Sequence, residues 1–448
     1  MKYYLFKGFR KLLLIAGITA SATTLMAQQT NAFSAQEAVD YALKNTVQVK
    51  NALLAVQIQK QTNREVTAAA LPQINGNVNY TNYLNIPTSL LPGEFFGQPG
   101  TYIPVQFGVK HNLTYGVDLQ QLLFDGQVFV GLQARKSTMD FAQKAVEVTQ
   151  EQIKVNVMKI YYQVQAGRQQ IATIDANITR FEKLFSDTKE IFKNGFAEKL
   201  DVDKTEVTLT NLKTQKLKSE NQIIVALEGL KLLMGMPSKD SLILKDTIRE
   251  DKLKENIAEE VYSYTDRKEF QQVQLQEKLN EYNIKRYQLT YIPTLSVSGN
   301  YSRNAQRQEF NFFKTGKQWF STTFIGVKLA VPIFDGFARD ARIMGAKLAL
   351  QQTQNNRENL KLSIDEEVEV ARVNIHTAIA SMDFQKKNMA LAEAVYNQTK
   401  LKFEQGLGSN TEITTSQSEL TTAQNNYFSA LYDAIIARID FLKATGKL

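Results

Sequence analysis

The chain has 448 residues, 43% of them hydrophobic, and a formal net charge of +8. It contains no cysteine, which excludes disulfides, thiolate sites and a lipid-modified N-terminal cysteine. Its two histidines, His111 and His376, are too few for a histidine-rich metal centre. Gly93, Gly97 and Gly100 lie in a proline-rich loop rather than between a strand and a helix, so they do not predict a phosphate-binding loop. We therefore expect neither an enzyme nor a bound cofactor.

The first 27 residues have the pattern of a secretory signal peptide. Four Lys and Arg residues precede an apolar stretch over residues 12–20, and small residues follow it. Cleavage is expected after Ala27, with Ala22 as the alternative. A membrane anchor is the other interpretation, but the apolar stretch is short and carries Thr and Ser. Loss of the segment removes four cations and no acid, which lowers the formal charge to +4 and leaves little reason to expect a nucleic-acid partner.

The rest of the sequence repeats itself. YGVDLQQLLFDG, which ends at Gly126, aligns without a gap with IGVKLAVPIFDG, which ends at Gly336, at an offset of 210 residues. Upstream, LPQINGNVNY aligns with IPTLSVSGNY at an offset of 221, so a loop in the second copy is eleven residues shorter. Gly235 and Gly446 correspond at an offset of 211. This self-similarity indicates an internal duplication.

The duplication predicts two structural repeats with the same order of elements. Each is expected to run helix, strand, loop, strand, very long helix, tight turn and helix. The first repeat spans 28–237, the second spans 263–448, and a linker over 238–262 joins them. The expected strands are 72–84, 112–124, 292–302 and 319–334, and the expected helices that follow them are 127–193, 196–235, 337–404 and 409–446.

The strands are expected to have one apolar and one polar face. In NLTYGVDLQQLLF, apolar residues from Leu113 to Leu123 occupy alternate positions, interrupted by Gln121. Asp118 and, in the second repeat, Lys328 belong to the opposite, polar face. A soluble sheet with one wet face gives the same alternation. The length of 13 residues favours strands that cross a bilayer at a tilt, with Asp118 and Lys328 in the lumen of a barrel.

The predicted helices are longer than those of most globular proteins. The 67 residues from Gln127 to Lys193 would extend about 100 Å at about 1.5 Å per residue. Apolar residues recur along both long helices with 3-4-3-4 spacing, which is the seam of a coiled coil. Gly195 and Gly406 are then expected to reverse each repeat into its last helix. The seam positions are Ile153, Val157, Ile160, Val164, Gly167, Ile171, Ile174, Ile178, Phe181 and Phe185, and then Ile364, Val368, Ala371, Ile375, Ala378 and Met382.

The FDG triplets fall where each repeat is expected to change from strand to helix. The Phe residues place an aromatic ring at a membrane–water boundary. The Asp residues are expected to cap the helix N-terminus, and the Gly residues to allow the bend. An ordinary strand–helix turn in a soluble domain is the alternative. The six junction residues are Phe124, Asp125, Gly126, Phe334, Asp335 and Gly336.

Four membrane strands cannot close a barrel, and lipid tolerates no open sheet edge. A chain of this kind therefore has to assemble with copies of itself. Two copies would give eight strands, which is about the smallest barrel and has a lumen filled by side chains. Three copies would give twelve strands and an open lumen.

With these motifs in this order, the chain resembles the TolC-type outer-membrane efflux proteins over essentially its whole mature length. The matching segments are ALKNTVQVKNA, LPQINGNVNY, LFDG, PIFDG and the two glycine tips. The resemblance implies a mixed α and β fold, a homotrimer with a 12-stranded outer-membrane β-barrel on a periplasmic α-helical barrel. The chain departs from the family at Leu122 and Leu123, where proline is common, and in lacking the N-terminal cysteine of several members.

The resemblance also assigns roles to the two tips, where a periplasmic adaptor protein is expected to dock and the channel to constrict. Asp201 and Glu412 match acidic positions at the family's entrance, and Thr415 stands where a second acid is often found. Gly408 lacks the basic side chain that can lock the closed state. Favourable charge at the N-termini of helices is the alternative explanation for the two acids. The residues expected to contact the adaptor are Asn194, Gly195, Phe196, Gln405, Gly406 and Leu407.

One acidic cluster is expected to be a solvated surface rather than a chemical site. Asp365, Glu366, Glu367 and Glu369 crowd one turn of the second long helix. A run of like charges on a helix usually forms such a face.

The function implied by the resemblance is a passive exit duct, embedded in outer-membrane lipids and extending into the periplasm. It would work with a periplasmic adaptor and an inner-membrane pump of the RND or ABC type to expel small molecules. Type I protein secretion uses a duct of the same kind, so the sequence leaves the two functions, and the cargo, open. The other classes are a non-conducting periplasmic coiled coil and an adaptor protein. Adaptors normally carry one helical hairpin, whereas this chain carries two.

Overall fold

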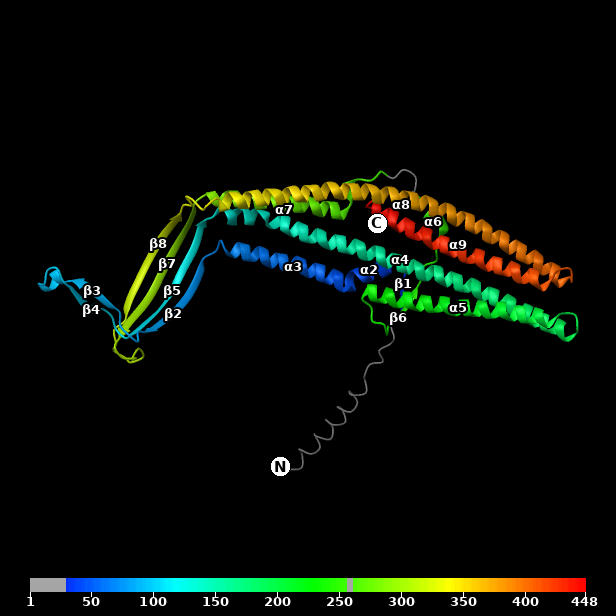
Figure 1. Cartoon of the computed structure of the whole chain (residues 1–448), viewed down its shortest axis with the longest axis horizontal. Coiled ribbons are helices and arrows are strands. Elements are labelled where there is room, and N and C mark those ends of the chain that lie inside the picture. Colours follow the sequence, from blue (N-terminus) through cyan, green and yellow to red (C-terminus); the bar gives the residue numbers. More distant parts are fainter. Residues whose placement is uncertain (1–29, 256–260) are drawn as a thin grey trace, which may run out of the picture. The chain divides into compact units, whose positions relative to one another are not determined.

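The computed structural model describes residues 30–255 and 261–448 of the chain (Figure 1). The predicted signal peptide at 1–27 therefore lies outside the described residues, as does part of the predicted linker over 238–262.

The described residues form two compact units, and neither coincides with a sequence repeat. Each unit draws on both repeats, and the two longest helices contribute residues to both units. The sheet unit consists of Leu53–Ala145 and Glu269–Leu360. The helical unit consists of the described residues of Met1–Ala52 together with Val146–Lys268 and Lys361–Leu448.

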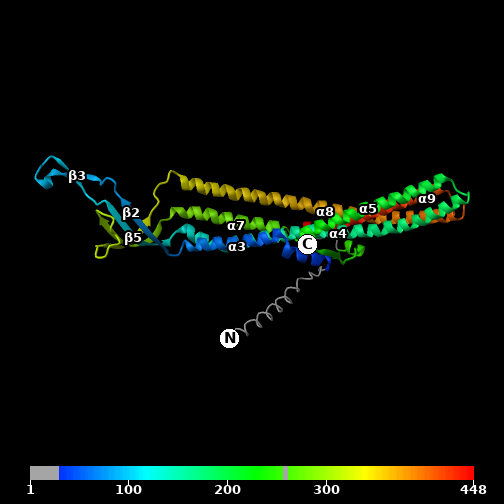
Figure 2. The same ribbon diagram turned by 90° about the horizontal axis from the view of Figure 1, so that it is seen from below.

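The sheet unit is built on a four-stranded antiparallel sheet with the strand order β2-β5-β7-β8 (Figure 1). Figure 2 shows β2 and β5 from below. The first two strands come from the first repeat and the last two from the second, so the pairing of β5 with β7 joins the repeats. Among the described strands, β2 and β8 each pair along one side and leave the other edge open. The strands are β2 (Gln73–Asn82), β5 (His111–Phe124), β7 (Thr294–Arg307) and β8 (Phe320–Ala330).

Both strands of the second repeat differ in their bounds from the predicted 292–302 and 319–334. β8 ends at Ala330, because Pro332 has no N–H group to donate to a ladder. β7 continues to Arg307, which pairs with His111 of β5. The apolar alternation fades after Tyr301, so the cross-strand partner rather than the local pattern sets where β7 ends.

The loop between β2 and β5 holds a second sheet that the sequence pattern did not predict. β3 (Thr88–Pro92) pairs antiparallel with β4 (Tyr102–Gln106), and a 3-10 turn, η1 (Gly93–Phe96), begins their connection. Four of the chain's eight prolines lie in the segment 87–104. Because proline is depleted in strands, the sequence predicted a loop there. We call residues 83–110 the loop hairpin.

Helices from both repeats complete the sheet unit. In the first repeat, the Asn63 side chain of α3 donates to the carbonyl oxygen of Arg135 in α4 at 3.1 Å. In the second, Arg357 of α8 forms a 2.9 Å ion pair with Glu277 of α7. The duplication thus extends to the helix pairs. These helices are α3 (Val47–Ala68), α4 (Gly126–Lys193), α7 (Lys268–Gln288) and α8 (Ala338–Glu404).

The helical unit contains the later parts of α4 and α8 and the helices that return from their tips. Seam positions such as Ile153, Val157, Ile364 and Ile375 are buried, as the 3-4-3-4 spacing predicts. Within the described part of the chain, no helix combines the length and apolar content needed to cross a membrane. The other elements of this unit are β1 (Thr30–Phe33), α2 (Ala35–Asn45), α5 (Lys199–Met234), β6 (Ser241–Leu244), α6 (Glu250–Leu253), η2 (Tyr264–Asp266) and α9 (Asn410–Ala444).

The two repeats end in the same contact. Gly235 and Gly446 follow the last helices with positive φ values of 68° and 73°. A Cβ on Gly235 would lie 2.7 Å from the carbonyl oxygen of Asn45, and one on Gly446 would lie 2.9 Å from the Cβ of Asp266. Asn45 and Asp266 are themselves related by the repeat offset of 221. Both glycines are therefore required by backbone conformation and by close approach.

Beside this contact the repeats differ. The buried Arg267 donates to Glu367 at 2.8 Å and to the carbonyl oxygen of Ala444 at 3.0 Å, and Lys443 donates to Glu367 at 3.0 Å. The counterpart of Arg267 is Thr46, whose buried hydroxyl oxygen has no hydrogen-bond partner among the described residues. The expectation that the acidic cluster is only a solvated face is therefore wrong for Glu367. It is wrong also for Asp365, which accepts a 2.6 Å hydrogen bond from Tyr262.

Candidate functional site: a two-faced sheet and two helical tips

One face of the four-stranded sheet is mostly polar. Asp118 lies opposite Asn75 of β2 and Asn300 of β7, and Lys328 lies opposite Ser296. The register thus places both charged residues on one face. That face also carries Leu122, Phe320 and Phe324 and, as amide or hydroxyl side chains, Gln73, Asn75, Asn77, Asn79, Thr81, Asn112, Thr114, Gln120, Ser296, Ser298, Asn300, Ser302, Asn304, Gln306 and Thr322.

Asp118 is held by amides from both neighbouring strands. Asn77 of β2 donates to its carboxylate, and Asn300 of β7 donates at 2.7 Å. Because donors on two sides fix the carboxylate, the three strands share one polar network. Period-two alternation had placed Asp118 on this face, but only the register shows which amides meet it.

The opposite face of the sheet is apolar and largely exposed in the single chain. Its apolar residues on β5 run from Leu113 to Leu119, and after a β-bulge at Leu123 the face continues to Phe124, which pairs with Leu295. Without the bulged residue this is a length of about 34 Å at about 3.4 Å per residue. A tilt of about 40° reduces this to roughly 26 Å, close to the apolar band of outer-membrane strands. Its apolar residues are Ile74, Val78, Tyr80, Leu113, Tyr115, Val117, Leu119, Leu295, Val297, Tyr301, Ile325, Val327 and Leu329, and by register the same face also carries Gln121, Arg303, Ser321 and Thr323 and, at its loop end, His111 and Arg307.

Aromatic rings gather at both ends of this apolar face. At the loop end, Tyr115 lies 5.1 Å from Trp319 and Tyr80 lies 5.5 Å from Phe310, measured between ring centroids. At the helix end, Phe124 lies 5.5 Å from Phe129. Aromatic side chains are enriched at the two membrane–water boundaries, so their positions mark the edges of a membrane-crossing band.

The strand-to-helix junctions are capped by the predicted aspartates. Asp125 accepts a 2.8 Å hydrogen bond from the backbone N–H of Gln127. Asp335 accepts from the backbone N–H of Arg339 at 3.0 Å and from its Nε at 2.8 Å. Phe124 ends β5, whereas Phe334 does not end a strand, because β8 stops at Ala330.

The two junction glycines act differently, although the sequence predicted the same role for both. Gly336 has a φ of 66° and provides the expected bend, which continues through Phe337 with a φ of 68°. Gly126 is not among the residues with positive φ and is already the first residue of α4. A Cβ there would lie 2.6 Å from the Cβ of Leu289, so Gly126 is needed for close packing rather than for the bend.

Both helical tips have the same glycine-centred turn. Gly195 and Gly406 have φ values of 79° and 74°. The N–H of Phe196 binds the carbonyl oxygen of Ile191 at 3.0 Å, and that of Leu407 binds Lys402 at 2.9 Å, which is the Schellman pattern. Phe196 is 86% exposed and Leu407 is 78% exposed. Each tip therefore presents one large apolar side chain from a fixed turn. Asn194 and Gln405, the other predicted contact residues, are also exposed.

The predicted entrance acids lie in the first turns of the return helices. The carboxylate of Asp201 accepts a hydrogen bond from the backbone N–H of Glu198 at 3.4 Å as part of a capping box. Asp201 therefore also stabilises the N-terminus of α5. Glu412 is exposed in the first turn of α9, whose cap is Ser409. Thr415 is exposed one turn further along.

Sequence reasoning missed Asn410, which joins the two tips. Its buried side chain donates to the carbonyl oxygen of Asp201 at 2.7 Å and accepts from the hydroxyl of Thr205 at 3.3 Å. An asparagine beside a helix cap is common, so no local signal separated this residue from an ordinary capping residue.

Apolar side chains also lie exposed along the outside of the long helices. On α8, Leu362, Val373, Phe384 and Val395 recur every eleven residues, and all four are exposed. Eleven residues make three helical turns, so they form one stripe. Exposed apolar side chains of α5 are Leu200, Val207, Leu217, Ile224, Val225 and Leu232.

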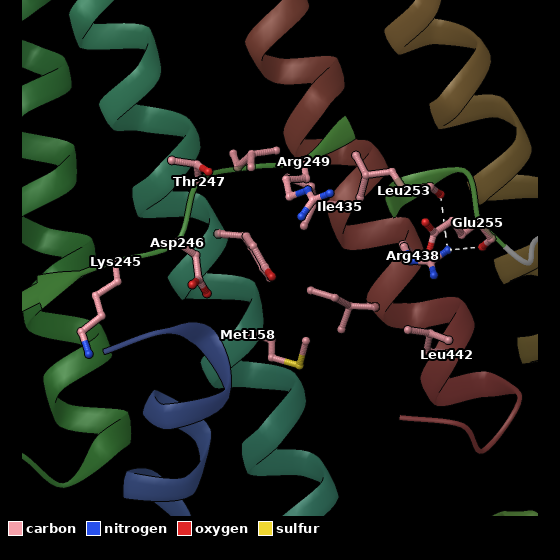
Figure 3. Close-up of a pocket in the computed structure, with 13 residues that line it drawn as sticks. Met158, Lys245, Asp246, Thr247, Arg249, Leu253, Glu255, Ile435, Arg438 and Leu442 are labelled. Atoms are coloured by element: carbon pink, nitrogen blue, oxygen red, sulfur yellow. Dashed lines mark hydrogen bonds between the residues drawn. The ribbon is translucent and has the colours of Figure 1, made fainter. Parts of the chain in front are cut away.

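A cavity of about 600 Å³ lies in the helical unit between α4, α9 and residues 245–255 (Figure 3). Met158, Ile435 and Leu442 contribute apolar walls, and Arg438 points to the carbonyl oxygen of Glu255 at 2.7 Å. Its charged groups thus serve local structure. Across residues 30–255 and 261–448, no cluster of three His, Cys, Asp or Glu side chains could hold a metal ion.

A sheet that is apolar on one face and polar on the other, combined with long coiled-coil helices, defines an outer-membrane channel of the efflux class. The chain belongs to the outer membrane efflux protein family: the model described as "Outer membrane efflux protein" matches residues 38–236 and 264–447. The two matched segments fall within the two sequence repeats. The protein is accordingly a protein of the outer membrane.

Relatives and solved structures agree with this assignment. The chain is 21% identical over 353 residues to outer membrane protein TolC of Vibrio cholerae, covering 75% of this chain and 77% of the relative. It is 21% identical over 451 residues to outer membrane efflux protein BepC of Brucella suis, covering 100% and 92%. Its fold is similar to that of CusC, whose solved structure matches with a TM-score of 0.75 at 16% identity, over 92% of each chain.

Proposed function

We propose that the protein is the exit duct of a tripartite efflux or secretion system. The observation that carries the proposal is the open sheet, with one face suited to lipid, one suited to water and two unpaired edge strands. Lipid tolerates no open edge, so β8 of one copy has to pair with β2 of the next. Because the four strands alternate in direction, this pairing continues the antiparallel order.

Three copies would give the 12-stranded barrel of a homotrimer, and the polar face would line its lumen. Asp118 and Lys328 would then be the charged groups of the lumen in each copy. The exposed apolar stripes on α5 and α8 support the same assembly, because apolar stripes of this size are usually covered by another helix. They would pack between copies to form a helical barrel in the periplasm.

The tips are the proposed docking sites for a periplasmic adaptor. Phe196 and Leu407 are exposed anchors on turns of fixed geometry, and such apolar anchors contribute most to the energy of a protein interface. The adaptor would connect the duct to an inner-membrane pump, which supplies the energy. The duct itself would conduct passively and catalyse no reaction.

The proposal is tested by purification and by deletion of the gene. Protein extracted from outer membranes should run as a trimer in native mass spectrometry and conduct ions in planar bilayers. A monomeric, non-conducting protein would favour a periplasmic structural coiled coil. In cells, dye accumulation after deletion indicates efflux, whereas loss of a protein from the medium indicates type I secretion.

A further inference from the structure

The loop hairpin at residues 83–110 exposes apolar side chains on both faces of its two strands. By register, Leu90 and Tyr102 lie on one face, and they are 64% and 71% exposed. Leu91 and Ile103 share the other face and are partly exposed. Phe95 and Phe96 are exposed in the connection. An isolated two-stranded sheet is marginally stable in water, so this hairpin is expected to be covered.

The tip of the hairpin is nevertheless firmly shaped by its own hydrogen bonds. The N–H of Gly93 binds the carbonyl oxygen of Thr101 at 2.8 Å, and the N–H of Gln98 binds the carbonyl oxygen of Gly93 at 2.9 Å. A Cβ on Gly93 would overlap the hydroxyl of Thr101, so the turn closes tightly. The exposed aromatic side chains are therefore presented by an ordered turn.

The composition of the hairpin favours contact with an identical copy. Glu94 and Lys110 are the two charged residues from 83 to 110, and Lys110 lies at the base of the hairpin next to β5, so copies can meet through the strands with little like-charge repulsion. The Glu94 carboxylate accepts a hydrogen bond from the backbone N–H of Gly100 at 3.3 Å, which holds it against its own turn. Pro92 and Pro104 lack the N–H groups needed to add another strand at the hairpin edges, which leaves contact through the faces.

The position of the hairpin in the sheet would place it beside the next copy of the chain. It leaves the sheet from β2, an edge strand, and therefore stands at the seam between copies in the proposed trimer. We propose that the hairpins of the three copies pack against one another through Leu90, Phe96 and Tyr102 and narrow the outer mouth of the duct. This inference rests on the trimer of the proposed function and adds to it a contact between the loop hairpins.

Cross-linking tests the contact directly, because the chain has no cysteine of its own. Phe96→Cys and Tyr102→Cys are introduced singly into full-length protein in outer membranes and treated with a short bis-maleimide. We expect covalent dimers and trimers on denaturing gels for both. Lys239→Cys, exposed in the turn between α5 and β6, is the control and should stay monomeric. Absence of cross-links at 96 and 102 in protein that native mass spectrometry shows to be trimeric would overturn the inference and leave the proposed function intact. Absence of trimers would overturn both.

Single-channel conductance tests whether the hairpins narrow the mouth of the duct. Fluorescence quenching by lipid tests whether the hairpins contact the membrane instead of one another. The triple variant Leu90→Ser, Phe96→Ser, Tyr102→Ser should remain trimeric and show a higher single-channel conductance than the parent, because the changed side chains are exposed and the apolar contact is lost. An unchanged conductance would contradict the narrowing. If the hairpins instead insert into lipid, a tryptophan at Phe95→Trp will be quenched by brominated phospholipids as strongly as Trp319 is, and that result would also overturn the proposal.

Discussion

The side-chain amide of Asn410 lies 2.7 Å from the backbone carbonyl oxygen of Asp201 and ties the first turn of α9 to the first turn of α5. Lys204 adds a second link, from its Nζ to the hydroxyl of Thr411 at 3.1 Å. The tips of the two repeats are thus joined within one chain. In the proposed duct, separation of these tips would widen the periplasmic end.

Asn410→Ala should therefore favour an open entrance. A buried hydrogen bond that loses its partner costs about 1–3 kcal/mol, which corresponds to a shift of roughly 5- to 150-fold in the balance between closed and open tips. Bilayer recordings should show a larger conductance, and cells should become more permeable to bulky antibiotics. Ser418→Ala, exposed on the same helix, is the control. Equal conductance in Asn410→Ala and the parent would show that the link does not restrain the tips.

The two entrance acids should make the pore selective for cations. In a trimer, Asp201 and Glu412 would place six carboxylates around the narrow end, and a field of one sign raises the local concentration of counter-ions. Asp201→Asn with Glu412→Gln should reduce cation selectivity and block by trivalent cations, measured as reversal potential and conductance. Asp203→Asn with Glu419→Gln removes the same charge at exposed positions nearby and should change neither. If selectivity survives the first pair, the ring lies elsewhere.

Proline at either tip glycine should abolish export while leaving the trimer in the membrane. The φ values of 79° at Gly195 and 74° at Gly406 are closed to proline, whose φ is near −65°. Proline would also remove the backbone N–H that donates to the carbonyl oxygen of Phe192 in the first tip and to that of Phe403 in the second. Dye-efflux assays with Gly195→Pro and Gly406→Pro are compared with Gly345→Ala, a helical position with open space around it. Normal efflux in both proline variants would exclude these turns as docking sites.

Neighbouring positions on β5 should differ in their access to water. Asp118 shares its face with Asn77 and Asn300, whereas Val117 and Leu119 lie on the apolar face. A charged, membrane-impermeant maleimide should therefore label Asp118→Cys and spare Val117→Cys and Leu119→Cys in intact outer membranes. Similar labelling at all three positions would mean that the apolar face does not contact lipid.

The ion cluster around Glu367 should make stability depend on pH. Burial alone would raise the pKa of Glu367, but hydrogen bonds from Arg267 and Lys443 outweigh it, so the pKa lies below the ordinary 4.5. A carboxyl with a lowered pKa stabilises the fold above its unfolded-state pKa, and this contribution is lost as pH falls through the folded value.

Glu367→Gln should accordingly destabilise the protein at neutral pH, because it leaves the buried Arg267 without its carboxylate. The loss is expected to be about 1–3 kcal/mol, below that of a fully buried pair because Glu367 is partly exposed. Thermal unfolding followed by circular dichroism should show a gap between the two proteins at pH 7 that closes below pH 4.5. Glu366→Gln, exposed on the same turn, should melt like the parent. A gap that persists at low pH would show that the cluster acts through packing instead.

Much of this protein follows from local periodicity in the sequence. Alternation at every second residue placed Asp118 on one face of β5 and Val117 and Leu119 on the other. The 3-4 spacing placed Ile153 and Val157 in a buried seam. Gly195 and Gly406 marked the tips, because few other residues adopt positive φ. These features depend on neighbours in sequence, so one sequence was enough to predict them.

The tertiary structure decided what depends on partners distant in the chain. The end of β7 at Arg307 is set by its pairing with His111, and the need for a glycine at 126 is set by Leu289. Likewise, Asn410 links the tips only because the fold brings α5 beside it. Glu367 holds α9 only because the fold brings Arg267 and Lys443 to its carboxylate. Side chains such as these can be satisfied by water as well as by protein, so their pattern in sequence does not say which partner they meet.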